Sequence, residues 1–186
     1  MEKEFRIGDT VSYGLHGKCQ VIGIEEVSLG GDSQTFYNLE TTKVVGAKHH
    51  GVGLKVLVPT EKAIAMGVRD PLTEENEVDT VLSALAEDEL KIPIEEHWKL
   101  KQKKLDDVIR IEGASGLAKA LGHLVQIQEN RKTLSSDESK YFKLIKRILS
   151  REIAEVFGFK SNKEADKKID SAIRKRIEEI EAQMHG

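Results

Sequence analysis

The fold of the first third of the chain is decided by residues 20–39, which read QVIGIEEVSLGGDSQTFYNL. Two segments of alternating apolar and polar character, 20–24 and 35–39, flank the turn Gly30-Gly31-Asp32, a sequence suited to a β-hairpin. A later apolar segment ends at Pro59, which cannot donate to a strand ladder and commonly closes a strand. Most of the 15 glycines also lie in this part of the chain. We therefore expect residues 1–70 to form a small antiparallel β-barrel.

The pattern changes at Thr73, because from there apolar residues recur at spacings of three and four, which is typical of amphipathic helices. Two sequences with Glu three residues after Ser, at Ser135 and Ser161, have the form of the capping box that begins a helix. Gly113 and Gly158 stand where left-handed residues end helices. The expected helices lie near residues 74–86, 94–112, 115–130, 136–157 and 162–184. The sequence thus predicts an α+β protein of two domains, a barrel over 1–70 and a bundle of about five helices over 71–186.

Charge is distributed unevenly along the chain, although the total of 29 basic and 32 acidic residues gives a net charge of only −3. Residues 1–70 carry −1, residues 71–96 carry −8 and residues 97–186 carry +6. This acidic stretch is expected to form a linker and the first helix, over residues 71–93. Because residues 161–186 are balanced, the basic surplus of the helical domain lies before residue 161, where a phosphate-binding face is then expected.

Composition argues against several classes of function. The single cysteine, Cys19, rules out an internal disulfide and a multi-cysteine zinc site, and His49-His50 lacks the further ligands that zinc requires. A thiol near His16 suggests nucleophilic chemistry, but nothing resembles an oxyanion hole, so a free, partly buried cysteine is preferred. We therefore predict no enzymatic activity, no metal and no cofactor. No segment has the length of a membrane helix, and a cytoplasmic protein that is monomeric when free is expected.

Trp98, the only tryptophan, is followed by a basic stretch that reads KLKQKK. On a helical wheel Trp98 aligns with Leu105, which favours a core position, but Lys101 and Gln102 occupy the places where the apolar stripe would continue, and burying them unpaired is costly. Both a core and an exposed tryptophan remain open. An aromatic ring among lysines at a helix end suits nucleic acid, because lysines neutralise phosphates and the ring stacks on or between bases.

A second basic row lies on the helix expected over 136–157, where Lys140, Lys143, Arg147 and Arg151 are spaced by three, four and four residues. An ordinary solvated helix face is the simpler explanation. Because this basic row lies in the same domain as the lysines around Trp98, a second explanation is that both belong to one continuous surface that faces phosphates.

Several motifs together resemble the CarD/CdnL family of bacterial RNA polymerase-binding transcription regulators. The opening FRIGDTVSY of residues 5–13 is similar to that family's first strand, and residues 66–70, MGVRD, are similar to the exit from its barrel. Trp98 before a basic helix matches the order and spacing of the family's DNA-binding domain. The resemblance implies a Tudor-like barrel that binds the polymerase β subunit, and a helical domain that contacts promoter DNA at the upstream edge of the melted bubble. It also implies association with the nucleoid through the polymerase.

Roles for particular residues follow from the resemblance. Trp98 would act as a wedge in the DNA minor groove, with neighbouring cations on the phosphate backbone. The predicted DNA-binding residues are Trp98, Lys99, Lys101, Lys103, Lys104, Lys140, Lys143 and Arg147. The predicted polymerase-binding residues are Glu25, Val27, Lys55 and Leu57.

Two departures from the family pattern affect the polymerase contact. Many relatives have arginines where this chain has Val27 and Leu57, so that contact is expected to be more apolar or to use Lys55 and Glu25. The hairpin over 41–53 is also longer than usual. An alternative function, a protein–protein adaptor without direct DNA contact, remains open. The barrel is shared with the transcription-repair coupling factor, but this chain lacks helicase motifs.

Overall fold

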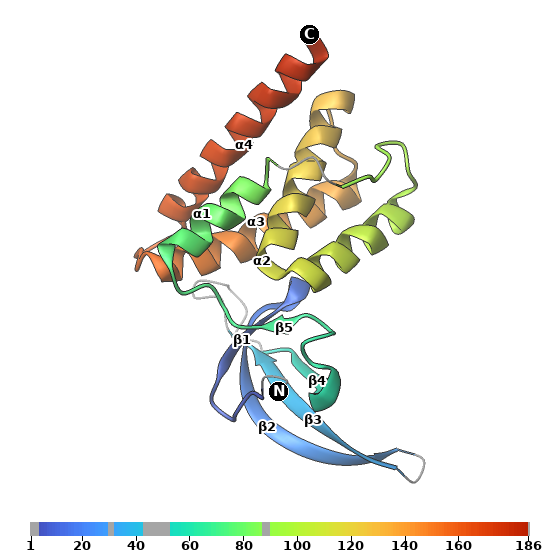
Figure 1. Ribbon diagram of the computed structural model, residues 1–186, viewed down its shortest axis with the longest axis vertical. Coiled ribbons are helices and arrows are strands. Elements are labelled where there is room, and N and C mark those ends of the chain that lie inside the picture. The colour runs from blue at the N-terminus through green and yellow to red at the C-terminus, as the bar shows by residue number, and fades with distance from the viewer. Residues whose placement is uncertain (1–3, 30–31, 43–52, 87–89, 186) are drawn as a thin grey trace. The chain divides into compact units, whose positions relative to one another are not determined.

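The computed structural model describes residues 4–29, 32–42, 53–86 and 90–185. These residues divide into two compact units, Met1–Pro71 and Leu72–Gly186 (Figure 1). The first unit contains strands and the second contains helices. Three features considered in the sequence lie outside the described residues: the turn at Gly30-Gly31, most of the hairpin over 41–53, and His49-His50.

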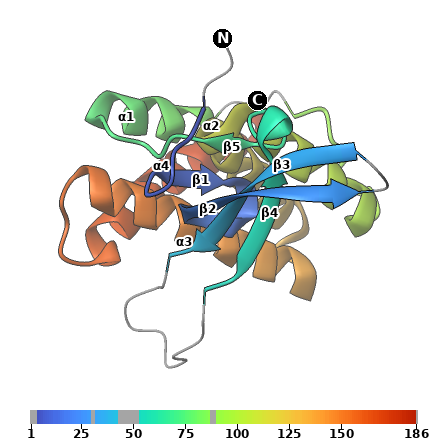
Figure 2. The same cartoon turned by 90° about the horizontal axis from the view of Figure 1, so that it is seen from below.

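Within the described residues, the first unit is one antiparallel sheet of five strands in the order β4-β3-β2-β1-β5 (Figure 2). The strands are β1 (Thr10–Tyr13), β2 (Gly17–Leu29), β3 (Asp32–Thr41), β4 (Lys55–Pro59) and β5 (Val68–Arg69), with short 3-10 turns at Gly14–His16 and Thr60–Lys62. The long β2–β3 ladder runs to the pair Leu29 and Asp32. The alternation that predicted strands over residues 20–24 and 35–39 is thus realised as a hairpin.

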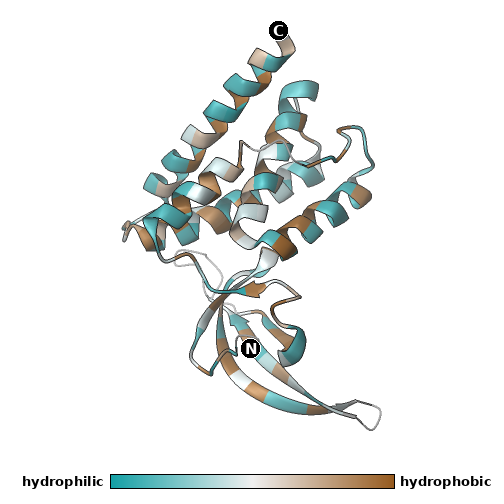
Figure 3. Cartoon of the chain, viewed as in Figure 1, coloured by the Kyte–Doolittle hydropathy of each residue, from teal (hydrophilic) through white to brown (hydrophobic). Residues whose placement is uncertain are grey.

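One face of this sheet carries the core of the unit. Hydrophobic and polar residues alternate along β2 and β3 (Figure 3), as expected for strands with one buried face. Phe5 packs edge-on against the Tyr37 ring, 5.9 Å between centroids, and its backbone N–H donates to the Tyr37 hydroxyl at 3.0 Å. The buried residues of this core are Phe5, Val11, Cys19, Val21, Tyr37, Leu39, Val58, Ala63 and Val68.

A β-bulge in β2 decides which of its residues face this core. Val21 pairs with Leu39 and Gly23 pairs with Asn38, so Ile22 is an extra residue on β2. An extra residue reverses the alternation of side chains along a strand. Val21 faces the core, but beyond the bulge odd-numbered β2 residues face away from it.

The described residues of the second unit form four helices: α1 (Glu75–Ala84), α2 (Trp98–Arg131), α3 (Ser136–Val156) and α4 (Asn162–His185). The predicted capping box of α3 is present, since Ser135 and Glu138 exchange side-chain and backbone hydrogen bonds. Apolar side chains of all four helices meet in the core of this unit. The largest fully buried ones are Leu85, Leu105, Leu117, Leu121, Leu124, Ile127, Ile145, Leu149, Ile153 and Ile169.

Helix α2 bends sharply at Gly113, whose backbone angles of φ 60° and ψ −123° are not helical. A positive φ is readily adopted only by glycine. The bend brings the two segments of α2 so close that a Cβ on Gly116 would lie 2.4 Å from the Val108 carbonyl oxygen. The sequence predicted two helices separated at this glycine, and the helical geometry does break there, although the two segments follow each other directly and carry the single label α2.

The predicted α+β class is confirmed, because an antiparallel sheet is followed by helices. The number of helices differs from the expected five, since the second and third run together through Gly113. Gly158 has a φ of 63° two residues after α3 ends, as predicted for a helix stop. In the part of the chain that the structure describes, no helix combines the length and apolar character needed to cross a bilayer.

Candidate functional site

Trp98 is the first residue of α2 and is partly buried against α3. Its ring meets the Tyr141 ring edge-on, with 5.4 Å between centroids and 79° between planes, a favourable aromatic geometry. The Tyr141 hydroxyl donates to a carboxylate oxygen of Asp106 at 2.5 Å. Trp98 therefore lies at the edge of the core, which is intermediate between the core and the exposed environments that the sequence left open. The hydrogen-bonded Tyr141 supports its ring.

The Tyr141 hydroxyl is held in its protonated form. Burial raises the pKa of Tyr141 far above its ordinary value of 10.0, and the hydrogen bond to Asp106 and the negative charge of Asp106 raise it further. Burial also raises the pKa of Asp106, although the hydrogen bond from Tyr141 opposes that effect. Because Asp106 comes from α2 and Tyr141 from α3, the hydrogen bond ties the two helices together beside Trp98.

Lys101 differs from the other lysines near Trp98, because its side chain is fully buried. Its ammonium donates to the Ile94 carbonyl oxygen at 2.7 Å and to a carboxylate oxygen of Glu138 at 3.2 Å. Lysine is almost never fully buried unless it is paired. The prediction that Lys101 contacts DNA is therefore corrected: its charge is enclosed between α2 and the start of α3, where no phosphate reaches it.

Glu138 links this ion pair to the capping box of α3. Its carboxylate accepts the Ser135 N–H at 2.9 Å and contacts Lys101 and the Arg131 guanidinium at 3.2 and 3.3 Å. Burial alone would raise the pKa of Glu138, but the hydrogen bonds from Ser135 and Lys101 and the charge of Lys101 outweigh it, and the pKa is lowered. Glu138 is thus an anion that fixes the first turn of α2, and with it Trp98, against α3.

The remaining predicted cations lie at the surface, but not all are equally available. Lys104 pairs with Glu96 at 2.7 Å, and Lys140 is 3.6 Å from Asp137. Four predicted DNA-binding cations are exposed and form no ion pair with any residue that the structure describes. They are Lys99 and Lys103 on α2, and Lys143 and Arg147 on α3.

A hollow of about 410 Å³ lies beside Trp98, between α2 and α3. It brings Lys99 and Lys140, which the sequence predicted separately, to the same place. Its lining residues are Trp98, Lys99, Gln102, Asp137, Lys140, Tyr141 and Leu144. Four of these, Gln102, Asp137, Tyr141 and Leu144, were not among the predicted site residues.

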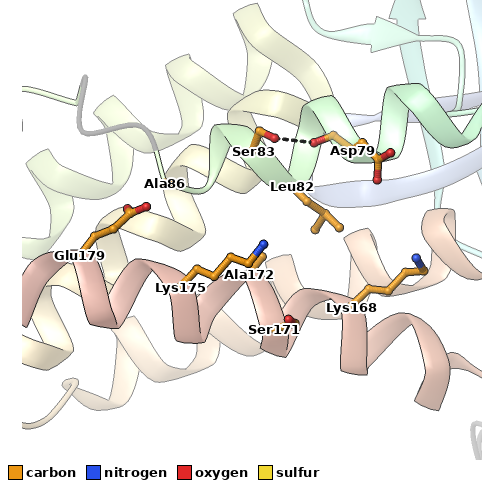
Figure 4. A pocket seen from close by; sticks show the side chains of 9 residues that line it. All are labelled: Asp79, Leu82, Ser83, Ala86, Lys168, Ser171, Ala172, Lys175 and Glu179. Carbon is orange, nitrogen blue, oxygen red and sulfur yellow. Dashed lines mark hydrogen bonds between the residues drawn. The ribbon is translucent and has the colours of Figure 1, made fainter.

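A second, larger hollow of about 480 Å³ lies between α1 and α4 (Figure 4). Lys168, Lys175, Asp79 and Glu179 supply two positive and two negative charges to its lining, and its other residues are small or aliphatic. None of the predicted site residues lines it. Its balanced charge gives it no preference for a phosphate backbone.

The four predicted polymerase-binding residues lie on the sheet of the first unit. Glu25 and Val27 follow the bulge in β2, and Lys55 and Leu57 belong to β4. The register pairs Glu25 with Phe36 and Leu57 with Asn38, and both partners lie on β3. All four predicted residues therefore share one face, opposite to the core.

This outer face, defined by Glu25, Val27, Lys55 and Leu57, combines charge with exposed apolar surface. Leu57 is 48% exposed, and Glu25 accepts a hydrogen bond from the Asn38 amide at 2.8 Å. Val27 and Phe36 lie on the same face as Leu57 and are partly exposed, so this face carries apolar area from three neighbouring strands that a protein partner can cover. Asn38, which holds Glu25 in place, had no signal in the sequence.

Residues 5–70, which contain this whole sheet, match the family model of the CarD-like/TRCF RID domain, the RNA polymerase-interacting domain of CarD-like proteins. Residues 5–70 form a CarD-like RID domain. The resemblance inferred from the opening strand is thereby confirmed for the first unit. The matched residues make up about a third of the chain, and the match supports an RNA polymerase-interacting, transcription-related protein. The outer face is a face of the RID domain.

Proposed function

We propose that this protein is a transcription regulator that binds the β subunit of bacterial RNA polymerase through its RID domain. In this proposal its helical unit contacts promoter DNA at the upstream edge of the melted bubble and stabilises the open complex. The match of residues 5–70 to the RID family supports the polymerase contact. The observation that carries the DNA contact is the group of four exposed cations on the helices that hold Trp98, none of which forms an ion pair with a described residue.

The proposed DNA contact has two physical components. Lys99, Lys103, Lys143 and Arg147 neutralise phosphates and hold the duplex on both sides of the bubble edge. Trp98 presents a partly exposed ring at a helix end, and a flat apolar ring inserted at a disrupted base step disfavours re-annealing. The ion pair between Lys101 and Glu138 keeps this ring in place while DNA is bound. A stabilisation of 1.4 kcal/mol shifts the population of the open state about tenfold.

The proposed polymerase contact uses the outer face of the RID domain. Leu57 contributes buried apolar area, and Glu25 and Lys55 contribute charge complementarity and orientation. This composition differs from the arginines expected in relatives and predicts an interface that depends less on salt. Localisation in the cytoplasm at the nucleoid follows from the same proposal.

Binding of the purified β subunit by the full chain tests the polymerase contact. We expect Leu57→Asp to weaken binding at least tenfold, because a carboxylate would be buried against the partner. Ile64→Asp is the matched control, since Ile64 is 47% exposed in the same unit but lies in the turn between β4 and β5. Equal effects of both substitutions on binding would refute the role of the outer face.

Salt dependence tests the DNA contact separately. The affinity of the full chain for promoter DNA should fall as salt rises, and Lys103→Ala should reduce the slope of log K against log salt by about one. The control is Lys167→Ala, because Lys167 is also an exposed lysine but lies on α4, outside the four cations of the proposed contact. A flat salt response in the unsubstituted protein would contradict the DNA contact and favour the adaptor function.

A further inference from the structure

We propose that the hollow beside Trp98 binds one unpaired nucleotide base that carries an exocyclic amino group. This inference rests on the proposed DNA contact and adds to it. A wedge only separates a base step, whereas a hollow with a defined lining takes up the base that the wedge displaces. The inference would make the helical unit a reader of base identity at the bubble edge.

The walls of the hollow suit a flat ring. Trp98 forms a partly exposed aromatic wall, the buried Tyr141 ring supports it edge-on, and Leu144 adds aliphatic surface. A base stacked on the partly exposed Trp98 ring would gain the favourable interaction that is usual between bases and aromatic side chains. With a volume of about 410 Å³, the hollow is in the size range of sites that hold small ligands. The hydrogen bond from Tyr141 to Asp106 and the buried ion pair of Lys101 hold both aromatic residues in place before DNA arrives.

The charged residues that line the hollow suit the two parts of a nucleotide, its phosphate and its base. Lys99 and Lys140 lie at the hollow and supply positive charge for the flanking phosphates. Asp137 contributes the single carboxylate among the described residues that line it, and its oxygen is 3.6 Å from Lys140, so the pair is loose. A carboxylate repels phosphate, which makes Asp137 unfavourable in a surface that binds only backbone.

Asp137 is favourable if a base enters the hollow. An ionised carboxylate accepts hydrogen bonds only, so it pairs with the amino group of cytosine, adenine or guanine. Thymine has no amino group and presents carbonyl oxygens on both sides of its one N–H, which the carboxylate repels. Gln102 carries both a donor and an acceptor and can complete the recognition of the same base edge.

The larger hollow between α1 and α4 provides an internal comparison (Figure 4). It is similar in volume, but none of the described residues that line it is aromatic, and its lysines are matched by Asp79 and Glu179. Size alone therefore does not distinguish the hollow beside Trp98. The combination of a partly exposed aromatic ring, two cations and one carboxylate does.

The test uses the full chain and its fluorescence, because Trp98 is the only tryptophan and reports directly on a base stacked in the hollow. The ligands are three forked duplexes that differ only in one unpaired junction nucleotide, dA, dC or dT. A fully paired duplex of the same length controls for absorption of the exciting light. We expect junctions with dA or dC to quench Trp98 at about fivefold lower concentration than the junction with dT.

Two variants decide between base recognition and simple charge. Asp137→Asn should abolish the preference for dA and dC over dT. Asp107→Asn is the matched control, since Asp107 is also an exposed carboxylate that pairs with a cation three residues away, and it should keep the preference. Quenching that is equal for the three junctions overturns the inference while the proposed DNA contact stands. Absence of binding to all the DNA ligands overturns both.

Discussion

Replacing Lys101 by Met tests whether this lysine supports the helical unit rather than binding DNA. The substitution keeps an apolar side chain of similar length in the buried site and removes only the ammonium. Glu138 loses its closest cation, at 3.2 Å, and the Ile94 carbonyl oxygen loses a donor at 2.7 Å. A buried anion that has lost its partner is strongly destabilising.

The magnitude follows from the contacts that remain. Breaking a buried ion pair by removing one partner typically costs 3–5 kcal/mol. Glu138 keeps the Ser135 N–H and the Arg131 guanidinium, and the Ile94 oxygen also accepts from Arg131. We therefore expect a loss near the lower limit, about 3 kcal/mol. Lys103→Met, an exposed lysine without an ion pair among the described residues, should change stability by less than about 0.5 kcal/mol.

Urea unfolding followed by Trp98 fluorescence measures this loss of stability in the helical unit, because Trp98 lies in that unit, three residues from Lys101. The effect also depends on pH. The pKa of Glu138 is lowered in the folded state, so its contribution is complete above the ordinary value of 4.5 and is lost as pH falls through the folded value. The difference between the unsubstituted protein and Lys101→Met should therefore stay constant from pH 7 down to about 4.5 and shrink as pH falls further.

The double variant Lys101→Met with Glu138→Gln separates the ion pair from general packing. It should be more stable than the sum of the two single losses predicts, because neither charge is then left without its partner. A Lys101→Met protein within 0.5 kcal/mol of the unsubstituted one, with no dependence on pH, would refute the reasoning.

Three further predictions concern the packing around the site. Gly122→Ala should lower the free energy of unfolding by more than about 2 kcal/mol despite the better helix propensity of alanine, because its Cβ would lie 2.1 Å from the Leu85 carbonyl oxygen; thermal unfolding measures this. Gly113→Ala should cost about 1–2 kcal/mol, because the residue has a φ of 60°, and circular dichroism melting checks it. Tyr141→Phe removes the hydrogen bond to Asp106 and should cost about 1.5 kcal/mol in urea unfolding while DNA binding becomes weaker.

The sequence was sufficient for the class of the fold, because strand alternation and helical periodicity are local signals. The hairpin of β2 and β3 and the capping box of α3 follow from residues that are close together in the chain. The kink of α2 was anticipated as a break because glycine at 113 marks a helix stop. That the helix continues directly after it depends on the close approach of Gly116 to Val108, which is a tertiary contact.

The candidate site was only partly predictable, and the failures share a cause. The position of Lys101 in the chain suggests a phosphate contact, but its environment depends on Glu138, which is 37 residues away. Likewise, the bulge at Ile22 decides that Glu25 and Val27 face away from the core, and no local pattern announces it. Trp98 was identified because a single aromatic residue beside lysines is rare. Its partner Tyr141 appeared in the sequence only as one member of an apolar stripe.

The central claim is that the RID domain delivers Trp98 to the edge of the promoter bubble, and the lifetime of the open complex tests it most directly. Open complexes are formed with RNA polymerase and the full chain, and their decay is followed after addition of a competitor. We predict that Trp98→Ala shortens the lifetime about fivefold or more, as loss of one stacked ring implies, while binding to the β subunit is unchanged. Ile111→Ala, which removes an equally apolar side chain that is 72% exposed on α2, should leave it unchanged. An unaltered lifetime for a folded, polymerase-bound Trp98→Ala protein would contradict the account.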